Sequence, residues 1–173
     1  MGKIVSFSNQ KGGVGKTTTC VNMAAYIAET GKKVLLVDID PQGNATTGFG
    51  FSKSSLKKSV YNVLIDDAPA ADNILKTEVE NLDLLPSNID LAGAEVELVY
   101  KRSREKVLKS ALEPEKAKYD YIFIDCPPSL GLLTINALAA ADAVIIPIQS
   151  EYYALEGLSQ LMNSITLVKQ HLN

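Results

Sequence analysis

Short apolar stretches alternate along the chain with stretches whose apolar side chains recur at helical spacing. The apolar stretches are rich in β-branched and aliphatic residues and predict strands at residues 3–8, 33–38, 82–85, 119–125 and 143–148. Helical periodicity lies between them and predicts helices at residues 17–30, 61–65, 132–141 and 155–172. Such alternation is typical of an α/β fold, a mostly parallel sheet with helices on both faces.

Three stretches add detail to this pattern. Residues 33–38 are almost continuously apolar, which is expected of a strand buried on both faces. Residues 41–50 are rich in Gly, Asn and Thr and predict a mobile loop. Residues 89–112 alternate apolar and charged side chains and predict one long helix or two abutting helices.

The overall composition limits the class of protein. A chain of 173 residues fits a single domain, residues 1–173. The 17 Lys and Arg against 20 Asp and Glu give a net charge of −3, which excludes a strongly basic nucleic-acid module. No apolar run approaches the ~20 residues of a membrane span. Cys20 and Cys126 form neither a C-x-x-C pair nor a disulfide framework, so we expect a cytoplasmic protein.

The segment between the first strand and the first helix is rich in glycine and ends in Lys-Thr. It reads Gln10-Lys11-Gly12-Gly13-Val14-Gly15-Lys16-Thr17-Thr18. A strand, a glycine-rich loop and a helix opened by Lys-Thr form the arrangement of a phosphate-binding loop. The glycines let backbone N–H groups approach phosphate oxygens, and the positive end of the helix favours anions. Lys16 is expected to reach the β- and γ-phosphates, and the Thr17 hydroxyl to bind Mg²⁺.

The loop departs from the usual G-x-x-x-x-G-K-[ST] pattern at its start. Gln10 occupies the position of the first glycine, and a second lysine, Lys11, follows it. One triphosphate needs only Lys16. Lys11 is therefore either a solvated loop residue or a group that contacts a nucleotide of another subunit, as an arginine finger does in trans.

Acidic residues end two of the predicted strands. Asp125 ends Tyr-Ile-Phe-Ile-Asp, and a carboxylate at the tip of a strand beside a phosphate-binding loop can hold Mg²⁺ directly or through water. Its alternative role is a helix N-cap. Asp38 and Asp40 lie two residues apart, so their side chains start on the same face and suit the orientation of an attacking water. Asp40 could instead cap the turn that begins at Pro41.

Four separate blocks of sequence resemble those of the ParA/MinD family of ATPases. Lys11 to Thr17 matches the deviant Walker A motif, whose first lysine is the signature of the family. The other blocks are Val37-Asp38-Ile39-Asp40-Pro41-Gln42-Gly43-Asn44, Ile124-Asp125-Cys126-Pro127-Pro128-Ser129-Leu130-Gly131 and Glu151-Tyr152-Tyr153-Ala154-Leu155-Glu156-Gly157. Their order is most similar to that of chromosomal ParA proteins of the Soj type.

The resemblance implies a P-loop NTPase fold that binds ATP and Mg²⁺. By resemblance, the catalytic residues are Lys11, Lys16 and Asp40, with Asp40 positioning the attacking water and Asp38 giving structural support. The implied metal ligands are Thr17, Asp40 and Asp125. The implied nucleotide-binding residues are Lys11, Gly12, Gly13, Val14, Gly15, Lys16, Thr17 and Thr18. Residues 126–131 correspond to switch II, and residues 149–157 to part of a dimer face.

The function implied by the resemblance is an ATP-dependent dimerisation switch for chromosome or plasmid partitioning. An ATP·Mg-bound homodimer binds non-specific DNA of the nucleoid, and a ParB-type centromere-binding protein stimulates a weak ATPase that resets it. Chains of the family continue beyond the last helix predicted here. We therefore expect this chain to lack their C-terminal third, which carries most DNA-binding residues and much of the adenine pocket.

Other functions remain open from the sequence. A MinD-like membrane-associated division-site ATPase would rely on a C-terminal amphipathic helix, for which residues 155–172 have few cations. A metabolic enzyme or iron–sulfur carrier on the same scaffold, or a nucleotide-binding relic, are further alternatives. Cluster binding needs suitably placed cysteines, and Cys126 has the pattern of a small packed residue. The basic residues 101–109 are either a solvated helix face or part of a DNA-facing surface.

Overall fold

Six strands form one sheet in the order β3-β4-β2-β5-β1-β6 in the computed structural model, which describes residues 2–150 and 154–172. All neighbouring strands are parallel except β3 and β4, which pair antiparallel. The predicted mostly parallel sheet is therefore confirmed. The strands are β1 (Lys3–Phe7), β2 (Val34–Asp38), β3 (Leu75–Lys76), β4 (Leu82–Leu85), β5 (Tyr121–Asp125) and β6 (Ala143–Ile145).

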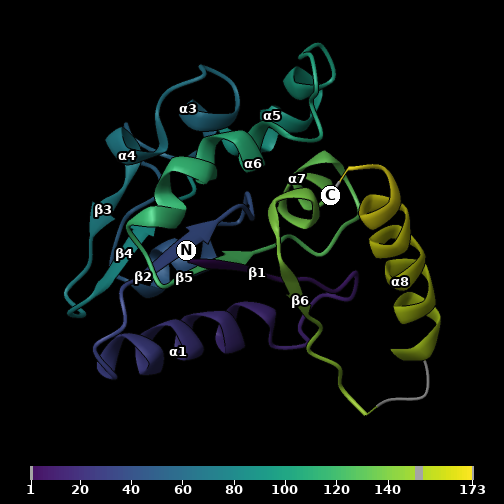
Figure 1. Cartoon of the computed structure of the whole chain (residues 1–173), viewed down its shortest axis with the longest axis horizontal. Coiled ribbons are helices and arrows are strands. Elements are labelled where there is room, and N and C mark those ends of the chain that lie inside the picture. The colour runs from purple at the N-terminus through teal and green to yellow at the C-terminus, as the bar shows by residue number, and fades with distance from the viewer. Residues whose placement is uncertain (1, 151–153, 173) are drawn as a thin grey trace.

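Helices cover both faces of the sheet, as Figure 1 shows, with α1 on one side and α3, α5, α6 and α7 on the other. No helix of the described part of the chain is long and apolar enough to cross a membrane. The helices are α1 (Lys16–Glu29), α2 (Asn44–Gly48), α3 (Val60–Leu64), α4 (Ala70–Asn73), α5 (Leu91–Leu98), α6 (Val107–Leu112), the 3₁₀ helix η1 (Glu113–Ala117), α7 (Leu132–Ala140) and α8 (Ala154–His171).

Alternate strand residues supply two separate cores. Leu35 and Val37 of β2 pack in the core that includes α5 and α6, whereas Val34 and Leu36 pack in the core that includes α1. All five residues of β2 are buried, as expected for its continuous apolar sequence. Each fully buried aliphatic side chain contributes about 1.5–3 kcal/mol to folding, so both layers hold the sheet in place.

Two predicted elements are wrong in detail. Residues 89–112 form neither one helix nor two abutting ones, because residues 99–106 separate α5 from α6. Ser103 lies in this separating segment with φ 50°, a left-handed conformation that an α-helix cannot continue. Residues 41–50 contain the short helix α2 and are not a loop throughout. Thr46 of α2 is hydrogen-bonded to Asp38, and this contact holds the segment against the sheet.

Candidate functional site

Three central strands end at the same level and bring the predicted site residues together. In the register of the sheet, Asp125 of β5 lies opposite Phe7 of β1 on one side and opposite Asp38 of β2 on the other. The glycine-rich loop follows β1, and Asp40 follows β2. The carboxyl ends of the parallel strands therefore place the loop and the acidic residues at one edge, where open α/β sheets bind ligands.

The glycine-rich loop takes the backbone conformation that its glycines allow. Gly13 has φ 73° and Gly15 has φ 87°, both in the left-handed region. No atom lies within 4 Å of the position a Cβ would take at Gly12 or Gly13, so the loop leaves open space there. α1 begins at once with Lys16 and has no acidic side chain in its first turn. Its positive end is thus available to an anion.

The Lys16 side chain forms a hydrogen bond to the start of its own loop. Its Nζ donates a hydrogen bond to the carbonyl oxygen of Lys11 at 3.1 Å, and only 6% of the residue is exposed. Burial lowers the pKa of the Lys16 ammonium, and the nearby carboxylates of Asp125 and Asp40 oppose this effect. An anion bound in the loop would stabilise the charged form further.

The loop is hydrogen-bonded to the segment that follows β6. The Asn9 side chain donates to the carbonyl oxygen of Pro147 at 2.7 Å and accepts the Lys11 amide at 3.0 Å. Further along, the Gln149 side chain donates to the carbonyl oxygen of Gly13 at 3.0 Å. These bonds fix the loop backbone, while the role of the Lys11 side chain in trans stays a prediction.

Asp125 is a buried carboxylate without hydrogen bonds of normal geometry. Both of its oxygens are inaccessible and unpaired among the described residues. Burial, and to a smaller extent the charge of Asp38, raise the pKa of Asp125 to about 7, although the nearby Thr17 hydroxyl lowers it. An unpaired buried carboxylate is unfavourable unless something binds it. A divalent cation between Asp125 and the Thr17 hydroxyl would provide that partner.

The site fits a cation that takes few ligands from the protein. Among residues 2–150 and 154–172 no group of three or more His, Cys, Asp or Glu side chains is placed to hold a metal ion. Mg²⁺ prefers oxygen ligands and is commonly held by one or two protein groups together with phosphates and water. Thr17 and Asp125 each offer oxygen atoms that could serve as such ligands.

Asp38 is occupied with structural hydrogen bonds. Its Oδ2 accepts from the Thr46 amide at 2.8 Å and from the Thr46 hydroxyl at 2.7 Å, and its Oδ1 accepts from the Asp40 amide at 3.1 Å. Burial raises the pKa of Asp38 to about 6, although these hydrogen bonds lower it. Asp38 thus connects β2 to α2. The sequence did not identify Thr46, because nothing in its spacing distinguishes it from the neighbouring threonine.

One carboxylate oxygen of Asp40 accepts a hydrogen bond within a turn, and the other is available to a ligand. Its Oδ1 accepts from the Gln42 amide at 2.9 Å, the bond expected of a turn cap. Its Oδ2 has no hydrogen bond among the described residues. The carbonyl oxygen of Asp40 accepts from the Ser87 hydroxyl at 2.8 Å, which fixes the backbone. Sequence reasoning missed Ser87, which lies 47 residues away in the chain.

The segment after Asp125 joins the site to α7. Cys126 is fully buried, and burial raises the pKa of its thiol to about 12, as expected for a packed residue and not for a nucleophile. The Thr134 hydroxyl donates to the carbonyl oxygen of Ser129 at 2.8 Å. The predicted dimer face at residues 149–157 falls partly outside the described residues, because residues 151–153 are not among them.

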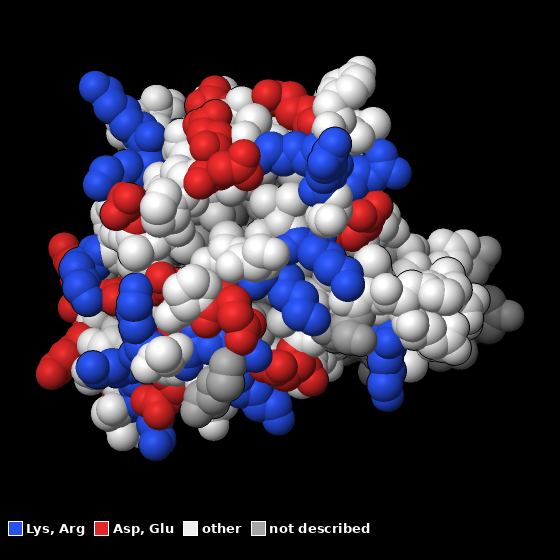
Figure 2. Space-filling model, turned by 45° about the horizontal axis from the view of Figure 1, so that its top comes forward, with Lys and Arg blue, Asp and Glu red and all other residues white. Residues whose placement is uncertain are grey.

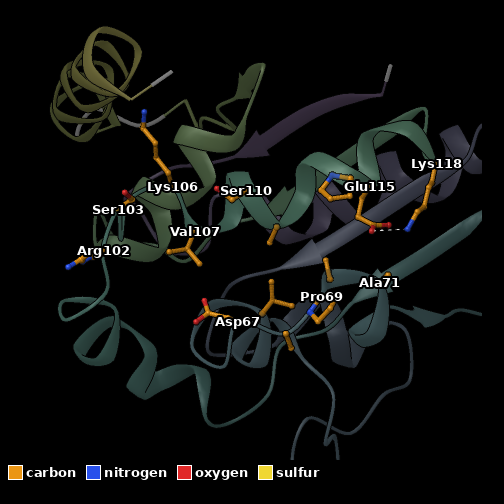
Figure 3. A pocket seen from close by; sticks show the side chains of 15 residues that line it. Asp67, Pro69, Ala71, Arg102, Ser103, Lys106, Val107, Ser110, Glu115 and Lys118 are labelled. Carbon is orange, nitrogen blue, oxygen red and sulfur yellow. Dashed lines mark hydrogen bonds and ion pairs between the residues drawn. The ribbon is translucent and has the colours of Figure 1, made fainter.

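The basic residues 101–109 do not form a helix face. Lys101 pairs with Asp67, and Arg104 pairs with Glu105, so two of the cations are neutralised within the chain. Arg102 and Lys106 line a cavity of about 570 Å³, in which Val107 lies across from Asp67 (Figure 3). On the face shown in Figure 2, basic and acidic side chains are interspersed and form no continuous basic surface. A DNA contact of this segment stays a prediction.

Comparison with known proteins gives consistent matches over the whole chain. A family model described as an AAA domain matches residues 2–173. The sporulation initiation inhibitor protein Soj of Bacillus subtilis is 65% identical over all of this chain and 68% of its own length. The chromosome partitioning protein ParA of Myxococcus xanthus is 57% identical over all of this chain. The chain spans only 61% of that relative's length.

A solved structure shares the fold closely. A Mycobacterium smegmatis protein described as cobyrinic acid a,c-diamide synthase, with a bound ATP analog and magnesium, is 44% identical with a TM-score of 0.95. The match covers all of this chain and 70% of that one. Identity is higher to Soj and to the Myxococcus ParA than to this structure. The findings therefore confirm the resemblance to ParA and Soj and do not favour a MinD-like regulator.

Proposed function

Because the chain belongs to the AAA domain family and groups with Soj and ParA, we propose that it is a partition ATPase that binds ATP with Mg²⁺. The observation that carries the proposal is the buried, unpaired Asp125 carboxylate beside Lys16 and Thr17 at the end of the glycine-rich loop. This combination of an anion-binding loop and an unsatisfied acid is what a phosphate-bound cation would complete.

The residues of the loop have distinct roles in this proposal. The backbone of residues 12–15 and the start of α1 bind phosphate oxygens, and the Lys16 ammonium contacts the β- and γ-phosphates. Thr17 and Asp125 hold Mg²⁺, which when bound neutralises charge on the phosphates. Since phosphoryl transfer requires mainly alignment and charge stabilisation, the hydrogen bonds that hold this loop to the segment after β6 support the chemistry.

Asp40 is the residue that we assign to the attacking water. Its Oδ2 is left over after the turn bond to Gln42, and Ser87 holds its backbone in place. A carboxylate fixed in this way can accept a hydrogen bond from water and orient it toward the γ-phosphate. Asp40 could also reach the cation through water.

The wider function follows from the partition relatives. We propose that the ATP-bound chain forms a homodimer in which Lys11 of each copy reaches the nucleotide of the other. The dimer then binds DNA without sequence preference, and a ParB-type protein stimulates hydrolysis to release monomers. The support is the family relationship together with the loop that carries Lys11. ATP acts as a switch ligand because monomer and dimer bind it differently.

Substitution of Asp40 tests the proposal. Asp40→Ala should bind ATP as the wild type does, hydrolyse it far more slowly and accumulate as a dimer. Turnover is measured by phosphate release, and mass by size-exclusion chromatography with light scattering in ATP·Mg²⁺ and in ADP. Asp72→Ala, at an exposed carboxylate of α4, is the matched control. Wild-type turnover in Asp40→Ala would remove Asp40 from the mechanism, and a monomer in every sample would refute the switch.

A further inference from the structure

The turn after β2 is held by a lysine from the loop that follows α2. The Lys53 ammonium donates a hydrogen bond to the carbonyl oxygen of Gln42, 11 residues earlier in the chain. The amide of the same Gln42 donates to the Asp40 carboxylate at 2.9 Å. Lys53 and Asp40 are therefore bonded to the two ends of one residue, and a shift of Gln42 would displace its bond to the carboxylate.

The aliphatic part of Lys53 lies against Gly43, the next residue of this turn. Its Cδ is 3.1 Å and its Cβ 3.6 Å from the point that a Cβ of Gly43 would occupy, and the Cβ of Ser87 is 3.8 Å from that point. Gly43 is buried, although its neighbours Gln42 and Asn44 are exposed. A glycine with φ 61° thus lets the stem pack on the backbone, and Lys53 and Ser87 together cover the turn.

Lys53 differs in this respect from the other lysines of its loop. Residues 52–58 contain three lysines, and Lys57 and Lys58 are exposed, with no hydrogen bond or ion pair to the described part of the chain. Lys53 is only partly exposed, because its stem packs on the turn while its ammonium stays near water. Holding a lysine in one position costs side-chain entropy, which the contacts with Gln42 and Gly43 offset.

We infer that Lys53 is a positioning residue for hydrolysis, which holds the turn of residues 40–43 so that the free Asp40 oxygen keeps its orientation. Lys53 acts through the Gln42 backbone and not by contact with the nucleotide. Misplacement of a reacting group by 1 Å can slow a reaction by about 100-fold. Because Ser87 still holds the Asp40 carbonyl, the expected loss without Lys53 is smaller, about 10-fold. This role rests on the proposed function, since it requires Asp40 to orient the attacking water.

Two substitutions at Lys53 separate its hydrogen bond from its bulk. Lys53→Met keeps an aliphatic stem and removes the donor, whereas Lys53→Arg keeps a positively charged donor. Lys57→Met is the matched control, because it removes the same charge from the same loop at a side chain without this contact. Steady-state phosphate release gives kcat and KM for ATP·Mg²⁺, and thermal unfolding verifies that each variant is folded.

Lys53→Met should lower kcat by about 10-fold and change KM by less than about 2-fold, and Lys53→Arg should restore most of the loss. In an Asp40→Ala background, single-turnover hydrolysis of radiolabelled ATP should show little further loss, because residues that act as a unit are not additive. A raised KM, or the full loss repeated in Asp40→Ala, would overturn the inference, since Lys53 would then act independently of Asp40. Equal kcat in Lys53→Met and Lys57→Met would overturn it and leave the assignment of Asp40 intact.

Hydrogen–deuterium exchange of the ligand-free protein tests the same contact without hydrolysis. The Gln42 amide is bonded to the Asp40 carboxylate and the Gly43 amide to the Asp40 carbonyl at 2.8 Å, so exchange at residues 41–43 reports how firmly the turn is held. Exchange there should be at least about 3-fold faster in Lys53→Met than in Lys57→Met. Equal exchange would overturn the inference whatever the turnover. Wild-type turnover in Asp40→Ala would overturn both the inference and the assignment of Asp40, and this result distinguishes the two failures.

Discussion

Replacement of Asp125 by Asn should stabilise the ligand-free protein while weakening its proposed cation site. The pKa of Asp125 is raised from 3.8 to about 7, chiefly by burial. Each tenfold change in the proton-binding equilibrium corresponds to about 1.36 kcal/mol. The ionised Asp125 carboxylate therefore destabilises the folded state by roughly 4 kcal/mol. A buried amide without partners costs about 1–3 kcal/mol itself. The expected net gain at pH 8 is therefore about 1–3 kcal/mol.

The pH dependence gives the sign of the effect. Because the pKa of Asp125 is higher in the folded state, the folded state holds the proton more tightly than the unfolded chain. Its contribution to stability is fully present below about pH 4 and is lost as the pH rises through about 7. Burial also raises the pKa of Asp38, to about 6, so the free energy of unfolding falls for this reason too as the pH rises, in both proteins. Asp125→Asn should thus be more stable than the wild type at pH 8, and the difference should shrink and reverse sign near pH 4, where the wild-type carboxyl is neutral and only the cost of the buried amide remains.

Urea unfolding, without nucleotide and in the presence of EDTA, measures the difference in stability and its pH dependence. The free energy of unfolding is extrapolated to water at several values between pH 4 and pH 8. Asp72→Asn, at an exposed carboxylate, controls for the loss of one negative charge. The reasoning is refuted if Asp125→Asn is less stable than the wild type at pH 8, or if its pH dependence equals that of the wild type. Loss of the Mg²⁺-dependent part of ATP affinity should accompany the gain in stability.

Three further substitutions probe the loop and one cap. Lys16→Ala should abolish triphosphate binding in isothermal titration calorimetry, because it removes the charge that contacts the phosphates; unchanged affinity would refute the loop assignment. Gly15→Ala should lower the free energy of unfolding by about 1–2 kcal/mol. The cost comes from the left-handed backbone alone, because a Cβ there meets nothing closer than 3.9 Å. Ser59→Ala should cost about 1 kcal/mol in thermal unfolding by breaking the capping box with Asn62, without a change in ATP affinity.

The central part of the site follows closely from the sequence. A continuous apolar strand, a glycine-rich loop and Lys-Thr before a helix together determine the position of Lys16 relative to Asp125. Parallel pairing then brings residues 7 and 125 to the same level. These features are local patterns repeated in a regular topology, so their arrangement in space follows from the order of the elements.

The peripheral contacts could not be predicted in this way. The bonds from Thr46 to Asp38 and from Ser87 to Asp40 depend on side chains that meet only after the sheet has formed. The sequence of residues 89–112 shows helical periodicity throughout. In the structure no continuous helix forms, because Ser103 has a left-handed backbone conformation. A non-glycine residue in this conformation is uncommon, and tertiary contacts here override local propensity.

The internal bond from Lys16 to the Lys11 carbonyl has a consequence for how the protein could distinguish ADP from ATP. Apart from the Lys16 ammonium, which also contacts the γ-phosphate, a loop already held in this shape contacts the inner phosphates of ADP and ATP in the same way. A ligand that binds two states equally shifts neither of them, however tightly it is held. The conformational response to the terminal phosphate must therefore arise in segments that can take more than one position. The loop keeps one conformation, and the residues around Asp40 and after Asp125 are the ones that respond to hydrolysis.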